Sequence, residues 1–145
     1  MNPLSMTDDE RQHFLADIHV GIIAIERTDG PPLAVPVWYS YEPGGDVTVL
    51  MDGDSLKARL ITRAGRFSLC AQQEAPPYKY VSVEGPARIE PSDVERDSRP
   101  MARRYLGIKG GDRYTDSGSH GGNPIRVQMT PERWFTIDYS KATRT

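Results

Sequence analysis

The sequence predicts a mainly β protein, in which six or seven antiparallel strands form a small closed or split barrel together with three short helices. Two features predict this fold class. Short apolar runs are separated by turns rich in Gly, Pro and Asp, which is typical of consecutive hairpins with few long connections. Residues 81–90 also alternate apolar and polar side chains over the length of a half-buried strand. A packed sandwich is the alternative, but closure into a barrel leaves fewer unpaired strand edges.

The length and composition indicate a single domain over residues 1–145. The 18 basic and 20 acidic residues give a net charge of −2, which argues against a nucleic-acid partner. No apolar run approaches the roughly 18–20 residues that cross a membrane, and residues 1–12 lack the order of a secretion signal. We therefore expect a cytoplasmic protein with no membrane partner. The single cysteine, Cys70, excludes an internal disulfide, and the three scattered histidines argue against a metal site.

A helix and a run of strands form the first part of the chain. The segment Thr7-Asp8-Asp9-Glu10 is a capping box, so we expect an N-terminal helix over residues 7–19. Residues 20–90 are then predicted to form an antiparallel barrel meander. Because proline cannot donate a ladder hydrogen bond, Pro36 indicates a sheet edge or a bulge. Strands are expected at residues 20–26, 33–41, 47–51, 67–71 and 81–90, the first of them buried.

Helices and a loop connect and follow these strands. Ser55 is placed to cap a helix that Gly65 ends. The segment Ser92-Asp93-Val94-Glu95 is a second capping box, so residues 92–106 are expected to form helices with a kink or a break at Pro100. Residues 107–122 contain six glycines among polar residues and are predicted to form a flexible loop. Residues 125–139 supply the closing strands.

One stretch, residues 50–66, has the pattern of an anion site. A strand that ends in Asp52-Gly53-Asp54 leads into the helix that follows Ser55. A helix N-terminus presents unpaired amides and a partial positive charge, and both favour an anion. Ser55 adds a hydroxyl, and Lys57 and Arg59 add positive charge near an end of the helix where lysine is otherwise unfavourable. The alternative is an ordinary N-cap with solvated basic residues.

Aromatic residues accompany basic ones elsewhere in the chain. The stretch Tyr78-Lys79-Tyr80 begins the most regularly patterned strand, and Trp38 lies on the strand that contains Pro36. Flat aromatic side chains beside a basic site suit a planar ligand that carries a phosphate. The alternative is that these rings form cross-strand packing pairs.

The order of these features resembles that of the split barrels related to pyridoxamine 5′-phosphate oxidase, which bind flavins or deazaflavins. The resemblance covers about residues 7–139. It rests on the turn Asp29-Gly30-Pro31, the stretch PVWYSYEPGG, the S-x-K of Ser55–Lys57 and the stretch YKYVSVEGPARIEP. It implies a split barrel of the FMN-binding type and a homodimer with its cofactor sites at the interface.

The resemblance also implies roles for individual residues. Ser55 and Lys57 are implied to hold the cofactor phosphate, with Arg59 assisting at the anionic tail. The walls beside the cofactor ring are implied to be Pro36, Val37 and Trp38 together with Leu50, Met51 and Asp52. The ring or phosphate is implied to contact Tyr78, Lys79 and Tyr80, either within the chain or across the dimer interface.

The stretches AGRFSLCA and YKYVSVEG are most similar to the actinobacterial branch that uses the deazaflavin coenzyme F420. The resemblance therefore implies an oxidoreductase that transfers hydride from reduced F420 to a small conjugated or quinone-like acceptor. Because the cofactor carries this chemistry, no residue is assigned as catalytic. The alternatives are an FMN-dependent oxidoreductase, a cofactor-binding protein without turnover and, with less support, a haem-binding relative. The chain lacks the C-terminal arginine motif of enzymes that oxidise pyridoxamine phosphate.

Overall fold

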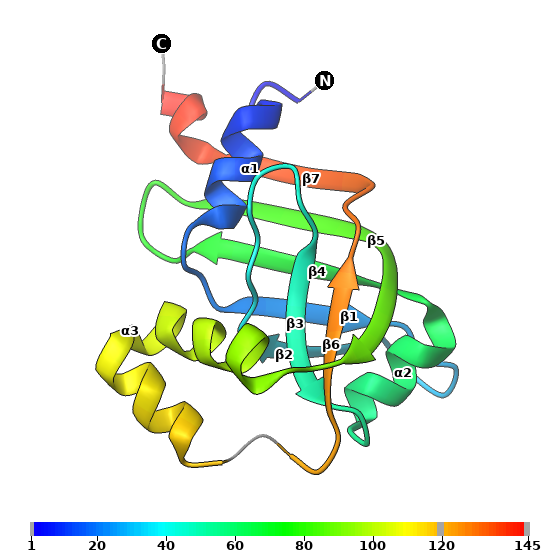
Figure 1. The fold of residues 1–145 in the computed structure, drawn as a ribbon. Helices are drawn as coiled ribbons and strands as arrows, with labels where there is room; N and C mark the ends of the chain where they lie inside the picture. The colour runs from blue at the N-terminus through cyan, green and yellow to red at the C-terminus, as the bar shows by residue number, and fades with distance from the viewer. Residues whose placement is uncertain (1, 119–120, 144–145) are drawn as a thin grey trace.

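The computed structural model describes residues 2–118 and 121–143, which form three α-helices and seven strands (Figure 1). The helices are α1 (Asp8–Ala16), α2 (Leu56–Ala64) and α3 (Arg99–Asp116). The strands are β1 (Gly21–Ile25), β2 (Leu33–Val37), β3 (Val47–Asp52), β4 (Arg66–Gln73), β5 (Lys79–Pro91), β6 (Pro124–Met129) and β7 (Arg133–Asp138). A π-helical turn (Val94–Ser98) precedes α3, and a 3-10 turn (Tyr139–Thr143) follows β7.

The strands form one curled antiparallel sheet in the order β2-β1-β4-β5-β6-β3, with β7 paired to β5. The two outer strands of this order, β2 and β3, lie at a seam. In the described part of the chain this seam is joined by one bridge, in which Ser40 and Thr48 exchange two backbone hydrogen bonds of 3.0 Å. The barrel is therefore split along the seam, which confirms the predicted fold class.

The predicted meander of residues 20–90 is correct for β1 and β2 but wrong for the strand that follows. β3 pairs with β6 instead of with β2. Pro36 lies on β2, an outer strand of the sheet. An outer strand tolerates proline because some of its N–H groups have no partner strand to donate to. β1 is also less buried than predicted, because Ile23 and Ile25 face the core whereas Ile22 is 39% exposed.

β5 changes partner along one of its sides. Residues 79–84 pair with β7, and residues 87–91 pair with β6. Gly85 lies where the partner changes, and a Cβ atom there would overlap the carbonyl oxygen of Thr130. The absence of a side chain at Gly85 therefore lets the chain between β6 and β7 cross close to β5.

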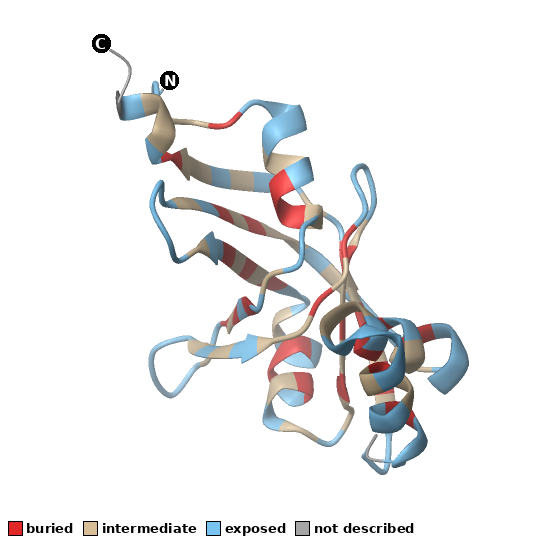
Figure 2. Cartoon of the chain, turned by 90° about the vertical axis from the view of Figure 1, so that its left-hand side faces the viewer, coloured by how far each residue is buried: buried red, intermediate tan, exposed pale blue. Residues whose placement is uncertain are grey.

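The core lies inside the curled sheet, and α1 and α2 cover its openings (Figure 2). The caps predicted for these two helices are confirmed: Thr7 and Glu10 form the capping box of α1, while Ser55 and Gly65 (φ +70°) bound α2. α1 ends at Ala16 instead of at residue 19. The carbonyl oxygens of Ala16 and Asp17 accept hydrogen bonds from Arg104 at 3.1 and 2.9 Å, in place of continued helix.

The helical segment after β5 begins differently from the prediction. Asp93, not Ser92, is the N-cap, and its carboxylate accepts a hydrogen bond from the Arg96 amide at 2.7 Å. The Ser92 hydroxyl instead donates to Asp97. Pro100 lies in the first turn of α3, directly after the π-helical turn, and the helix continues through it.

The predicted flexible loop of residues 107–122 is wrong for residues 107–116, which belong to α3. Gly107 (φ 76°, ψ 172°) interrupts α3 and divides it into two arms that fold against each other (Figure 1). Arg103 donates to both carboxylate oxygens of Asp112, at 2.8 and 3.0 Å. Gly111 lies so close to the first arm that a Cβ atom would be 2.5 Å from the Arg103 Cα. Ion pairs between the arms therefore favour a helical hairpin over a loop. Residues 119–120 of the predicted loop lie outside the described residues.

Candidate functional site

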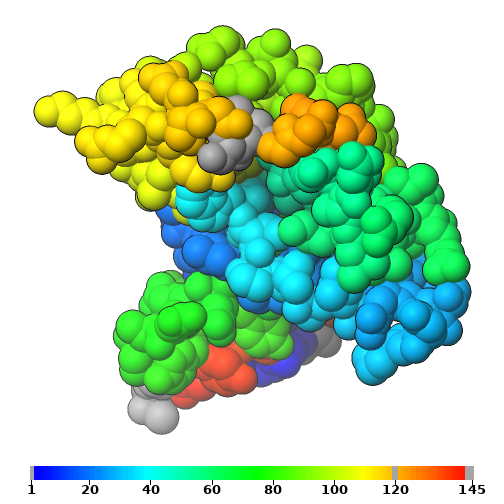
Figure 3. Space-filling view, turned by 90° about the horizontal axis from the view of Figure 1, so that it is seen from below, coloured from blue at the N-terminus to red at the C-terminus, as the bar shows by residue number. Residues whose placement is uncertain are grey.

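A cavity of about 390 Å³ opens between the ends of β2 and β3, the start of α2, α3 and the start of β6. These elements meet on one face of the molecule, whereas the loop between β4 and β5 stands apart (Figure 3). The predicted site residues that line the cavity are Pro36, Val37, Trp38, Leu50, Met51, Asp52 and Lys57. The structure thus brings together three separate stretches that the sequence analysis had linked.

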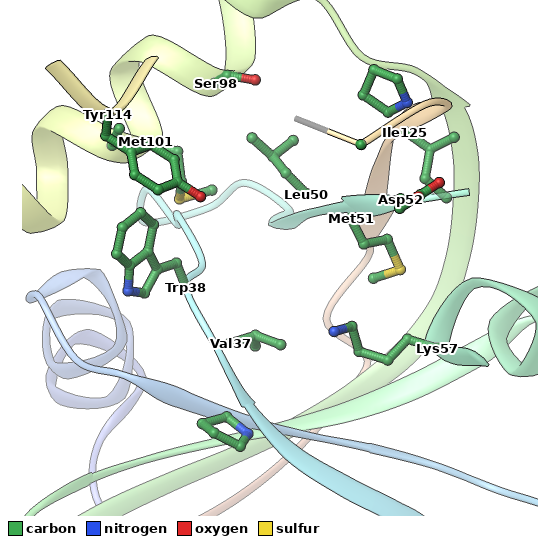
Figure 4. Close-up of a pocket in the computed structure, with 14 residues that line it drawn as sticks. Val37, Trp38, Leu50, Met51, Asp52, Lys57, Ser98, Met101, Tyr114 and Ile125 are labelled. Carbon is green, nitrogen blue, oxygen red and sulfur yellow. The ribbon is translucent and has the colours of Figure 1, made fainter. Parts of the chain in front are cut away.

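The cationic side of the cavity is the N-terminal end of α2. Lys57 lies in the first turn, and its ammonium group points into the cavity (Figure 4). The first turn of α2 has no acidic residue, so Lys57 has no carboxylate partner within that turn. Ser55 acts as the N-cap, because its Oγ accepts a hydrogen bond from the Ala58 amide at 3.2 Å. Ser55 does not line the cavity, so its observed role is to begin the helix that carries Lys57.

The opposite wall is aromatic. The Trp38 indole stacks on Tyr105 with ring centroids 4.9 Å apart and planes at 6°, and Tyr114 lies tilted against it at 5.6 Å. Tyr105 is held by its hydroxyl, which donates to the His19 carbonyl at 2.6 Å and accepts from the Tyr39 amide at 3.0 Å. Trp38 is therefore fixed from behind, and Figure 4 shows it beside Tyr114 at one end of the cavity.

Asp52 supplies a carboxylate on the side where β3 ends. Its Oδ1 accepts a hydrogen bond from the Asp54 amide at 3.0 Å. Gly121 (φ +76°) approaches this carboxylate so closely that a Cβ atom would be 2.9 Å from Asp52 Oδ2. The Gly53 amide donates to the Asn123 carbonyl at 2.7 Å, which ties the chain before β6 to the end of β3. The cavity thus combines a flat wall with one cation and one anion.

The other predicted site residues lie elsewhere in the chain. The Arg59 guanidinium turns back to the Asp54 carbonyl, at 2.9 Å, and does not line the cavity. Tyr78 directly precedes β5, and Lys79 and Tyr80 are the first two residues of that strand, where it pairs with β7. Lys79 is 4.0 Å from Asp138, and Tyr78 and Tyr80 are 51% and 36% exposed. These three residues therefore do not join the cavity within one chain.

Several lining residues were missed by the sequence analysis. They come from the π-helical turn, from α3 and from the segment before and within β6, and they are Ser98, Met101, Ala102, Tyr114, Gly121, Pro124 and Ile125. The sequence contains a pattern that could have predicted the helical lining residues. Arg99 and Arg103 are four residues apart, as are Asp112 and Asp116. This spacing places each pair on one face of a helix, so the two faces can attract each other.

Within residues 2–118 and 121–143, no group of three or more His, Cys, Asp or Glu side chains could hold a metal ion. Within the same ranges, no helix has the length and apolar character needed to cross a bilayer. Burial raises the pKa of Cys70, which holds this thiol in its neutral form.

The fold and cavity define a split β-barrel with an open, cation-bearing site beside its seam. The fold is shared with a conserved hypothetical protein of Mycobacterium tuberculosis, at 22% identity and a TM-score of 0.80, over 100% of this chain and 92% of that one. An F420 reductase matches at 18% identity and a TM-score of 0.69, over 86% of this chain and 94% of that one. A candidate pyridoxamine 5′-phosphate oxidase from Listeria innocua matches at 14% identity and a TM-score of 0.66, over 89% and 96% of the two chains.

A FAD-binding protein from Mesorhizobium loti also has this fold, at 18% identity and a TM-score of 0.65, over 91% of this chain and 93% of that one. No protein-family model and no curated protein sequence matches the chain. At these identities the likeness establishes the fold alone.

Proposed function

We propose that the chain is an oxidoreductase that binds the deazaflavin coenzyme F420 and transfers hydride from its reduced form to a small conjugated or quinone-like acceptor. The observation that carries the proposal is the position of Lys57, at the start of a helix and facing the flat Trp38 wall across one cavity. An F420 reductase among the proteins with this fold supports the choice of cofactor.

The residues fit a planar ring joined to an anionic group. The Lys57 ammonium and the free amides of the first turn of α2 would hold the phosphate. The ring would lie between the end of β3, with Met51, and the Trp38 side of the cavity. When bound, the reduced deazaflavin would supply the hydride, and the protein would orient the ring and exclude water from it.

We propose further that two chains form a homodimer in which Tyr78, Lys79 and Tyr80 of each chain complete the site of the other. Their distance from the cavity of their own chain and the exposure of both tyrosines support this arrangement. Sedimentation of the protein across a concentration series measures the oligomeric state. A monomer at all concentrations would contradict this part of the proposal.

The cofactor is tested by parallel titration of the purified apo protein with F420 and with FMN, followed by cofactor fluorescence. Tight binding of F420 with weak binding of FMN is expected. Preference for FMN would favour the alternative of an FMN-dependent oxidoreductase, which a FAD-binding protein of this fold supports. Turnover is tested by mixing the reduced cofactor complex with menadione without oxygen. Tight binding without oxidation across a panel of acceptors would favour a cofactor-binding protein.

A further inference from the structure

A second, smaller cavity of about 230 Å³ lies next to the first, under the N-terminal part of α3. Leu50 and Met101 line both cavities, so the two spaces are neighbours separated by two apolar side chains. The rest of the second cavity is mostly polar, and its polar lining residues are Ser40, Thr48, Arg96, Asp97 and Arg126. A ligand in the first cavity would reach the second by passing between Leu50 and Met101.

The sheet register places Arg126 in this cavity. Arg126 lies opposite Leu50 on β3 and opposite Glu90 on β5. Its neighbours Ile125 and Val127 are buried in the core, so the alternation of β6 turns Arg126 to the other face, under α3. The strand thus holds the guanidinium at a fixed position.

Asp97 is a buried carboxylate that lines the cavity and already accepts several hydrogen bonds. Asp97 accepts hydrogen bonds from Arg96 Nε and Nη2, at 3.0 and 2.8 Å, and from Arg126 Nη1 at 3.2 Å. It also accepts from the Asp93 amide at 2.9 Å and the Ser92 hydroxyl at 3.3 Å. Burial alone would raise the pKa of Asp97, but the hydrogen bonds from Arg96 and Asp93 bring it below its ordinary value. Asp97 is therefore ionised and has little capacity for a further donor.

Arg126 has donor capacity left over. Its Nε is buried and makes no hydrogen bond in the described part of the chain. Glu90 Oε1 lies 3.1 Å from this nitrogen as an ion pair, but not in hydrogen-bond geometry. Because Nε has almost no accessible surface and Nη1 donates to Asp97, the donor available to a ligand is Nη2, which makes no hydrogen bond within the described residues. The Ser40 hydroxyl, which also lines this cavity, is a further donor.

From these contacts we propose that the second cavity binds the carboxylate of the acceptor, with Arg126 as its principal donor, while the conjugated part of the same molecule lies in the first cavity. This inference rests on the proposed function and narrows its substrate class to conjugated carboxylates. Glu90, whose side chain is 47% exposed and lies 3.1 Å from Arg126 Nε, competes with that carboxylate for Arg126.

The test uses the apo protein with ¹⁵N-labelled arginine, so that it does not depend on cofactor binding or turnover. The protein is titrated with trans-cinnamate and, separately, with the neutral isostere cinnamamide, and the Arg126 Nε–H resonance is followed by NMR. We expect cinnamate to shift this resonance and to bind at least about tenfold more tightly than the amide, because hydrogen bonds to charged groups are the stronger ones.

Matched variants separate the cavity from general charge effects. Arg126→Gln should remove the preference for cinnamate, whereas Glu90→Gln should strengthen cinnamate binding by removing the competing carboxylate. Arg133→Gln, at a side chain that is 73% exposed on β7, should change neither affinity. If Arg126→Gln does not fold, Glu90→Gln and Ser40→Ala, which should weaken cinnamate binding, decide the question.

Equal affinities for cinnamate and cinnamamide, or an unchanged Arg126 resonance, would overturn the inference. Its failure is distinguishable from failure of the proposed function. Cinnamate binding without F420 or FMN binding would leave the second cavity standing and reject the oxidoreductase. Cofactor binding without a preference for cinnamate would reject the carboxylate site and leave the proposed oxidoreductase in place.

Discussion

Trp38 and Tyr105 stack face to face, with ring centroids 4.9 Å apart and planes at 6°. Trp38 follows β2 and forms a wall of the cavity, whereas Tyr105 belongs to the first arm of α3. The stack therefore joins the edge of the barrel to the helical hairpin. The binding of any ligand that lies against Trp38 therefore depends on the contacts that hold this hairpin to the barrel.

The attachment can be weakened without removing the ring. Tyr105→Phe keeps the stack but removes the hydrogen bonds to the His19 carbonyl and from the Tyr39 amide. We expect the free energy of unfolding to fall by about 1–3 kcal/mol, because the Tyr39 amide loses its partner. Urea denaturation measures this change. Tyr139→Phe, at an exposed ring, is the control, and an equal loss in both variants would contradict the assignment.

Lys57 is expected to contribute to cofactor affinity and little to stability. Lys57→Ala removes the ammonium group from the cavity, so the cofactor should bind more weakly by about 1.5–3 kcal/mol, the range for a lost hydrogen bond to a charged group. Fluorescence titration with F420 measures the change. Lys109→Ala, at an exposed position of α3, should bind as the unaltered protein does. Unchanged affinity in Lys57→Ala would reject the phosphate assignment.

The hairpin requires glycine where its two arms touch. In Gly111→Ala the new methyl group would lie 2.5 Å from the Arg103 Cα, so the arms must separate. We expect a loss of about 1–3 kcal/mol, the usual cost of overpacking. Thermal unfolding of Gly111→Ala and of Gly122→Ala tests this, because a Cβ atom at Gly122 meets nothing within 4 Å. Equal melting temperatures for the two variants would show that the arms are not packed as described.

Acid should loosen the same hairpin. Hydrogen bonds from Arg103 and Arg99 lower the pKa of Asp112 from its ordinary value of 3.8 to about 2. Because the pKa is lower in the folded state, Asp112 contributes stability above pH 3.8 and loses that contribution as the pH falls towards 2. Unfolding measured from pH 6 to pH 2 should show a smaller loss in Asp112→Asn than in the unaltered protein. Parallel curves for the two proteins would contradict this account.

Local patterns predicted those elements whose stabilising contacts lie within a few residues. The capping box of Thr7 and Glu10 and the Ser55 and Gly65 ends of α2 are of this kind, because each cap is satisfied within one helical turn. The alternation of residues 81–90 likewise predicted β5. Val81 and Val83 are buried as the alternation predicts, whereas Ile89, beyond the change of partner, is 38% exposed. Pro36 indicated an edge strand because the missing N–H is a property of the residue itself.

Contacts between distant residues decided the rest. Which strand β3 joins depends on pairing with β6, more than 70 positions further along the chain, and nothing within β3 specifies that partner. The glycine-rich segment became a helical hairpin because Arg99 and Arg103 meet Asp112 and Asp116 across the kink at Gly107. The candidate site follows the same division. The predicted residues Trp38, Met51 and Lys57 line the cavity, but its remaining wall and its polar neighbour exist only because the folded hairpin lies over β3 and β6.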